Sequence, residues 1–139
     1  EIIKEDFIPV IVPMGLDEKG VAYNINADTA AGAIARSIKS RRLMLLTDID
    51  GVLDNNEKLI SEINTIEAKE LINTETIHGG MIPKVKTCID AINNGVRAVV
   101  ILDGRKPHSI LFELFSDKGS GTLIRKWKHL NQLNIGYLI

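Results

Sequence analysis

The chain has 139 residues, of which 45% are hydrophobic and 25% charged, which is the composition of a globular domain rather than a disordered chain. Its 17 basic and 18 acidic residues nearly cancel, so the bulk charge favours no nucleic-acid partner. No apolar stretch reaches the roughly 20 residues that cross a bilayer, and no signal peptide is apparent. We therefore expect no membrane partner and a cytoplasmic location, and the absence of Met at position 1 suggests a fragment.

The first third of the chain predicts a strand, a hairpin and a helix. The apolar run 7–12 is expected to form a buried strand, although Pro9 weakens this interpretation. A turn signal at 17–20 lies between apolar stretches and indicates a hairpin. Asn26 can cap a helix over 27–40, because its side-chain oxygen can accept hydrogen bonds from the first turn.

The rest of the chain alternates strands with helices. Three apolar runs are expected to be strands: 43–46, 99–102 and 122–124. A small hairpin is expected to pair 52–53 with 59–60. Helices are expected at 65–72 (capped by Thr65), 81–93 and 107–115. This order predicts an α/β fold, a three-layer αβα sandwich with a mainly parallel sheet and helices on both faces.

Ligands bind at the carboxyl ends of the strands in such sheets, and three polar segments fall there: 24–28, 47–53 and 103–105. The first can be a simple helix cap and the second a polar turn. The phosphate loops of P-loop and dinucleotide enzymes are absent, and the histidines and cysteine lack zinc spacing, so we expect no protein-bound metal centre.

A further motif begins the helix at 81–93. Gly79 and Gly80 would let backbone N–H groups approach an anion at the helix N-terminus. Lys84 in the first turn is disfavoured by the helix dipole, by about 0.3–1 kcal/mol, unless an anion offsets it. Lys84 is therefore either a solvated lysine or a ligand for a negatively charged group.

Three segments resemble the N-acetylglutamate kinases of the amino acid kinase superfamily: Asn24-Ile25-Asn26-Ala27-Asp28, Thr47-Asp48-Ile49-Asp50-Gly51-Val52-Leu53 and Gly79-Gly80-Met81-Ile82-Pro83-Lys84. The resemblance spans roughly residues 7–124. It implies that 1–124 is the C-terminal, nucleotide-binding lobe of an amino acid kinase fold, followed by an unassigned extension, 125–139. The half of such kinases that supplies most of the acceptor site has no counterpart here.

The resemblance implies ATP-dependent phosphorylation of the side-chain carboxylate of N-acetyl-L-glutamate, a step of arginine biosynthesis, by a homo-oligomer. Lys84 would neutralise the transferring phosphoryl group, Asp28 would orient lysines around the phosphates, and Asn24 and Asn26 would contact the acceptor. Mg²⁺ would be held largely by the phosphates. The residues around the adenosine would be Thr47, Asp48, Ile49, Asp50, Gly51, Val52, Leu53, Thr76, Ile77, His78, Gly79, Gly80 and Met81.

A later segment resembles the C-terminal stretch of arginine-inhibited members of that family. It contains His108, Glu113, Gly119 and Gly121, and it implies arginine as a feedback inhibitor. Without the resemblance, an amphipathic helix and a glycine turn explain it equally well. Two hypotheses stay open: the ATP-binding half of an acetylglutamate kinase, inactive alone, or a non-catalytic domain of this fold that binds arginine or a protein partner.

Overall fold

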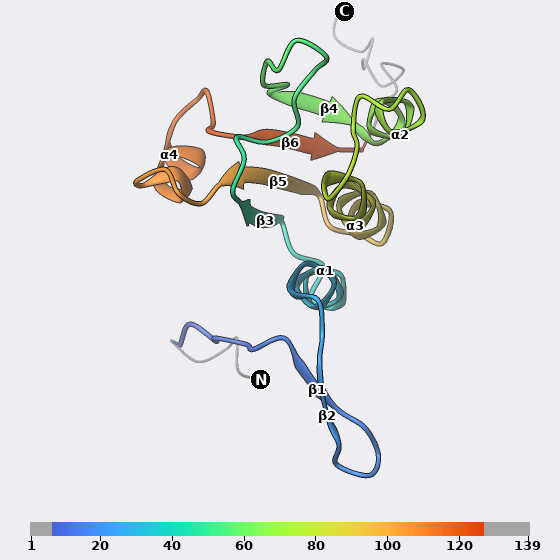
Figure 1. The fold of residues 1–139 in the computed structure, drawn as a ribbon. Helices are drawn as coiled ribbons and strands as arrows, with labels where there is room; N and C mark the ends of the chain where they lie inside the picture. Colours follow the sequence, from blue (N-terminus) through green and yellow to red (C-terminus); the bar gives the residue numbers. More distant parts are fainter. Residues whose placement is uncertain (1–6, 127–139) are drawn as a thin grey trace, which may run out of the picture.

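The computed structural model describes residues 7–126, which form six strands and four helices (Figure 1). The elements in chain order are β1 (Met14–Leu16), β2 (Ala22–Asn24), α1 (Ala27–Ser37), β3 (Arg42–Thr47), β4 (Glu62–Asn64), α2 (Thr65–Asn73), α3 (Met81–Asn93), β5 (Ala98–Asp103), α4 (Ser109–Phe115) and β6 (Thr122–Arg125). Of the expected extension 125–139, Arg125 ends β6, and residues beyond 126 lie outside the described part of the chain.

The hairpin expected near the start of the chain is confirmed. Strands β1 and β2 pair antiparallel, with Gly15 opposite Tyr23. The Asp17 carboxylate accepts hydrogen bonds at 2.9 Å from the backbone N–H groups of Lys19 and Val21, which fixes the turn. Figure 1 shows this hairpin extending beyond α1, away from the larger sheet.

The strand expected at 7–12 is wrong. This segment has no regular structure, and Ile8 and Val10 are 92% and 91% exposed. A strand is stable only beside a neighbour that satisfies its backbone N–H and C=O groups, and no strand in the range 7–126 pairs with this segment. Pro9, which lacks a backbone donor, weakens pairing further.

The larger sheet has the strand order β3-β5-β6-β4. Strands β3 and β5 run parallel, from Arg42 opposite Ala98 to Thr47 opposite Asp103. Strand β4 is parallel to β6, whereas β6 is antiparallel to β5. The mainly parallel sheet is therefore confirmed, with one antiparallel junction at its centre. Strand β4 was not expected, because it is only three residues long and buries one side chain, Ile63.

Helices α1, α2 and α3 cover one face of this sheet and form the main core with it. Helix α1 packs on β3 and α3, and α3 packs on β5 and β6. Cys88 of α3 is fully buried in this core. Burial raises the pKa of its thiol to about 12, so Cys88 is a packing residue rather than a nucleophile.

The second face of the sheet is covered near α4. Side chains alternate along a strand, so Val100 and Leu102 face away from the core residues Val99 and Ile101, yet both are fully buried. Arg42 also points to this second face, and its guanidinium lies 3.5 Å from the Glu113 carboxylate of α4. The helix after β5 therefore forms the third layer, and the expected αβα arrangement is confirmed.

Three helix boundaries differ from expectation, one of them the start of α4, which lies at Ser109 rather than 107. Helix α1 ends at Ser37 rather than near residue 40, and Lys39 then adopts a left-handed conformation with φ of 49°. Asn64, not Thr65, caps α2. The Asn64 side chain accepts from the N–H of Glu67, whose carboxylate in turn accepts from the Asn64 N–H. This reciprocal pair satisfies two donors that the helix geometry leaves free.

Candidate functional site

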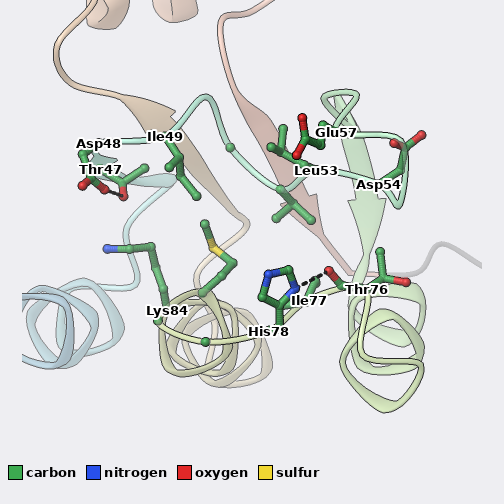
Figure 2. Close-up of a pocket in the computed structure, with 15 residues that line it drawn as sticks. Thr47, Asp48, Ile49, Leu53, Asp54, Glu57, Thr76, Ile77, His78 and Lys84 are labelled. Carbon is green, nitrogen blue, oxygen red and sulfur yellow. Dashed lines mark hydrogen bonds between the residues drawn. The ribbon is translucent and has the colours of Figure 1, made fainter.

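A cavity of about 650 Å³ opens at the carboxyl end of β3, between the loop that follows this strand and the start of α3 (Figure 2). It is lined by Thr47, Asp48, Ile49, Gly51, Val52, Leu53, Asp54, Glu57, Thr76, Ile77, His78, Gly79, Gly80, Met81 and Lys84. The two loops expected around an adenosine thus meet at one cavity, although they lie about 25 positions apart in the chain. In Figure 2, Thr47 to Ile49 form one side and Leu53 to Glu57 another.

One of the residues expected around the adenosine does not line this cavity, and two residues that do line it were not expected. The Asp50 carboxylate lies 2.8 Å from the Lys106 ammonium group instead. Asp54 and Glu57 line the cavity from the turn of the small hairpin. The polar turn between the two expected hairpin strands was the available signal for them, since Asp54 also accepts the backbone N–H groups of Asn56 and Lys58.

The small hairpin that pairs 52–53 with 59–60 forms one wall of the cavity. Leu53 and Leu59 make the antiparallel bridge that the sequence predicted, and the N–H of Ile60 donates to the C=O of Val52 at 2.9 Å. Gly51 begins the hairpin with a φ of 149°, which only glycine adopts readily. Its missing side chain also allows a close approach to β6, where an added Cβ would lie 2.6 Å from the Thr122 hydroxyl.

The opposite wall contains the start of α3. Gly79 is in the left-handed region with a φ of 55°, and open space surrounds both Gly79 and Gly80. Gly80 caps α3 without a side-chain hydrogen bond. A helix N-terminus carries a partial positive charge, so this wall favours an anionic group in the cavity.

Lys84 joins this wall to α1. Its ammonium nitrogen lies 2.6 Å from Oδ2 of Asp28, and the two side chains are only 15% and 26% exposed. Figure 2 shows the Lys84 side chain extending from α3 toward the side of the cavity where Thr47 and Asp48 lie. Two of the expected site residues, 56 positions apart in the chain, are thus brought into direct contact.

The two asparagines expected at the acceptor precede Asp28 in the chain. Asn26 caps α1, and its side-chain oxygen accepts from the N–H of Thr29 at 3.1 Å. Asn24 ends β2 and is exposed. Neither residue lines the 650 Å³ cavity, so the contact with an acceptor molecule remains a prediction.

The residues expected to bind arginine divide between two places. Glu113, Gly119 and Gly121 line a second cavity of about 290 Å³, together with Arg42, Ser61, Glu62, Ser116, Asp117, Lys118 and Leu123. The Glu113 carboxylate, whose side chain is 8% exposed, accepts the N–H of Ser120 at 2.9 Å. His108 does not line this cavity and precedes α4 with a φ of 60°.

The third polar segment, 103–105, lies at the carboxyl end of β5 outside the first cavity. The side chain of Asp103 is 4% exposed and accepts three hydrogen bonds from Arg105, one from its backbone and two from its guanidinium group. These bonds hold the pKa of Asp103 down, at about 2. The pKa of the Arg105 guanidinium is raised by the same contact.

Within residues 7–126, no group of three or more His, Cys, Asp or Glu side chains is arranged to hold a metal ion. In the same range, none of the helices is both long and apolar enough to cross a membrane.

Comparison with known proteins adds family relationships to this geometry. A sequence profile described as "Amino acid kinase family" matches residues 1–103. The acetylglutamate kinase of Pelagibacter ubique is 63% identical over 126 residues, and that of Methylobacterium nodulans is 54% identical over 125. These matches cover 91% and 90% of this chain but only 44% and 41% of the two relatives. The chain thus spans less than half the length of these relatives.

Among solved structures, the fold is similar to that of N-acetylglutamate synthase from Neisseria gonorrhoeae in a complex with coenzyme A and L-arginine. The TM-score is 0.77 at 30% sequence identity. This similarity covers 83% of the present chain and 27% of the synthase chain.

Proposed function

This chain belongs to the amino acid kinase family, and from that premise we propose that it is the nucleotide-binding part of an acetylglutamate kinase. In the whole enzyme, ATP would phosphorylate the side-chain carboxylate of N-acetyl-L-glutamate. The relatives that are 63% and 54% identical to this chain over the matched region carry that name, which favours a kinase over a non-catalytic domain of the same fold.

The observation that carries this proposal is the 650 Å³ cavity, which lies in the usual size range of ligand pockets. Its walls differ in character in the way that a nucleotide requires. Ile49, Val52, Leu53 and Ile77 offer apolar surface for a flat base. The start of α3 and Lys84 offer positive charge for phosphates.

Phosphoryl transfer depends mainly on positioning and on stabilising the charge of the moving group. We assign the charge stabilisation on this side of the reaction to the Lys84 ammonium group. The contact with Asp28 restrains Lys84 at the cavity, so little reorganisation is needed when phosphates arrive. As the bond from the γ-phosphorus to the bridging oxygen breaks, a carboxylate oxygen of the acceptor bonds to phosphorus, giving an acyl phosphate and ADP.

Mg²⁺ is expected with the nucleotide. It usually keeps several waters and binds through phosphates and one or two carboxylates, rather than in a cage of protein ligands. An ion held largely by the phosphates needs no such cage. Asp28 is the carboxylate that the structure places beside Lys84.

The acceptor would lie beyond Asp28, next to Asn24. Asn24 is exposed at the end of β2, three residues before the start of α1. The other groups that bind the acceptor would come from the portion of the relatives that this chain does not span. We therefore expect the 139-residue chain alone to form no acyl phosphate from MgATP and N-acetylglutamate, which trapping with hydroxylamine would reveal.

Calorimetric titration with MgATP tests the nucleotide site. We expect the wild-type chain to bind MgATP and Lys84→Ala to bind at least about tenfold more weakly, because a charge-assisted contact is lost. Lys86→Ala is the matched control, since Lys86 lies on the same helix but does not line the cavity, and its affinity should be unchanged. Absence of binding at millimolar MgATP in a folded sample would refute the proposed site.

A second, regulatory function is favoured by the 290 Å³ cavity. Its carboxylates include the nearly buried Glu113, which already contacts the guanidinium group of Arg42. A free arginine could bring a second guanidinium group to these carboxylates. The similar synthase structure contains L-arginine.

We expect L-arginine to raise the melting temperature of the wild-type chain. Citrulline has the same shape without the charge and serves as the control ligand, which should have no effect. The variant Glu113→Gln should respond less to arginine than the wild type. Equal shifts with arginine and citrulline would remove the support for this second function.

A further inference from the structure

Thr122 is the residue that attaches the cavity's hairpin to the main sheet. It is the first residue of β6, and its side chain is fully buried. Its hydroxyl accepts a hydrogen bond from the N–H of Val52 at 2.8 Å and donates one to the C=O of Ile60 at 2.7 Å. Val52 and Ile60 stand opposite each other in the hairpin, so one hydroxyl group holds both of its arms.

The fit between Thr122 and the hairpin is also close sterically. A Cβ at Gly51 would lie 2.6 Å from the Thr122 hydroxyl oxygen and 2.8 Å from a methyl carbon of Leu59. Contacts of this length are not tolerated, so the hairpin approaches β6 as closely as it does only because residue 51 is glycine. The hydrogen bonds and the close approach together fix where the hairpin lies relative to the sheet.

This position matters because the hairpin is a wall of the first cavity. Gly51, Val52, Leu53, Asp54 and Glu57 all line the cavity, whereas Thr122 does not. The hairpin itself is held together by few contacts, a single bridge between Leu53 and Leu59 and the backbone bonds around it. A wall with so little pairing of its own depends on its attachment to the sheet.

We propose that Thr122 is a positioning residue of the nucleotide site, acting through the backbone of Val52 rather than by contact with the ligand. The inference rests on the proposed function, because the ligand in question is MgATP. Removing the hydroxyl would leave the buried Val52 N–H and the partly buried Ile60 C=O without that partner, so the hairpin would move or loosen. The rest of the core would keep its packing.

The first test compares Thr122→Val, which keeps the shape and removes the hydroxyl, with Thr122→Ser, which keeps the hydroxyl. In calorimetric titrations well below the melting temperature, we expect Thr122→Val to bind MgATP about tenfold more weakly than wild type, and Thr122→Ser to stay within about twofold. Equal affinity of Thr122→Val and wild type would overturn the inference while leaving the proposed function intact.

Loss of stability alone has to be separated from loss of positioning. Val100→Ala supplies the control, because Val100 is fully buried on the opposite face of the sheet and makes no part of the hairpin. We expect it to lower the melting temperature, as core cavities do, and to leave the MgATP affinity within about twofold of wild type. If Val100→Ala weakened binding as much as Thr122→Val, general destabilisation would explain both and the inference would fail.

Hydrogen exchange on the ligand-free chain tests the same attachment without a nucleotide. Backbone amides between Val52 and Ile60 should exchange faster in Thr122→Val than in wild type or Thr122→Ser, with no matching change in α3. Unchanged exchange would overturn the inference. This measurement keeps its meaning even if the wild-type chain binds no MgATP, a result that would refute only the proposed function.

If Thr122→Val does not fold, Gly51→Ala replaces it, because the added methyl group would push the hairpin away from Thr122. Gly20→Ala is its control, since Gly20 also has a positive φ, of 80°, and open space around it. We expect weaker MgATP binding and faster hairpin exchange for Gly51→Ala alone. Equal behaviour of the two variants would contradict the role of Thr122.

Discussion

Lys84 occupies a position in the first turn of α3 where the helix dipole disfavours a positive charge. Only 15% of its side chain is exposed, so it is not a fully solvated lysine, whereas its role as a ligand for a phosphate stays a prediction. The Asp28 carboxylate is the anion that offsets its charge. If MgATP binds as proposed, this mostly buried ion pair would let the Lys84 cation be shared with a phosphate.

Asp103 provides a prediction about pH. Its pKa in the folded chain is about 2, below the ordinary value of about 3.9 expected in the unfolded chain, because Arg105 donates three hydrogen bonds to the carboxylate. A carboxylate with a lowered folded-state pKa stabilises the fold above its unfolded pKa, and this stabilisation is lost as pH falls toward the folded value.

We therefore expect the free energy of unfolding of the wild type to exceed that of Asp103→Asn near neutral pH. The difference should shrink between about pH 4 and pH 2. Urea unfolding of both proteins across this range is the measurement, and the other carboxylates cancel in the comparison. A difference that stayed constant down to pH 2 would contradict the assigned cause.

At the scale of elements, the helices and strands predicted correctly are those whose sequence patterns lie within the element itself. The runs that became β3 and β5 are continuous and apolar, and α3 has an apolar stripe that begins after two glycines and ends at Asn94. The outcome at β4 and at 7–12 depends instead on whether a neighbouring strand is present to pair with. The three residues of β4 are a strand because β6 lies beside them, whereas 7–12 has no such partner within 7–126.

The candidate site divides in the same way. Its loops were expected from motifs that resemble those of a known family, and the fold brings them to one cavity. The placement of Asp50 was not predictable, because it depends on Lys106, 56 positions later. The attachment of the hairpin by Thr122 spans 70 positions from Val52. No local pattern encodes contacts over such distances.

The cap of α2 gives a prediction at this scale. Asn64 shares a reciprocal pair of hydrogen bonds with Glu67, so Asn64→Ala should lower the free energy of unfolding by about 1 kcal/mol. Asn64→Ser should recover most of that loss, since serine also caps helices well. Chemical denaturation followed by circular dichroism measures both variants. No difference between alanine and asparagine at position 64 would argue against the cap.

At the scale of the molecule, apolar surface is concentrated in two regions. The segment 7–12 and the β1–β2 hairpin expose most of their large apolar side chains, and so does α4. Strand β3 ends the sheet order with one neighbour among the described residues. Exposed apolar patches and open strand edges are the features by which protein chains associate.

We therefore expect the 139-residue chain to self-associate, with an average mass in sedimentation equilibrium that rises with concentration. Replacing Ile8 and Val10 together by lysine should reduce association without lowering the melting temperature, because these side chains are 92% and 91% exposed. Ile66→Lys is the matched control. Ile66 is 54% exposed on α2, away from both regions, so its replacement should leave association unchanged. A wild-type chain that stayed monomeric at every concentration would show that these surfaces do not drive association between copies of this chain.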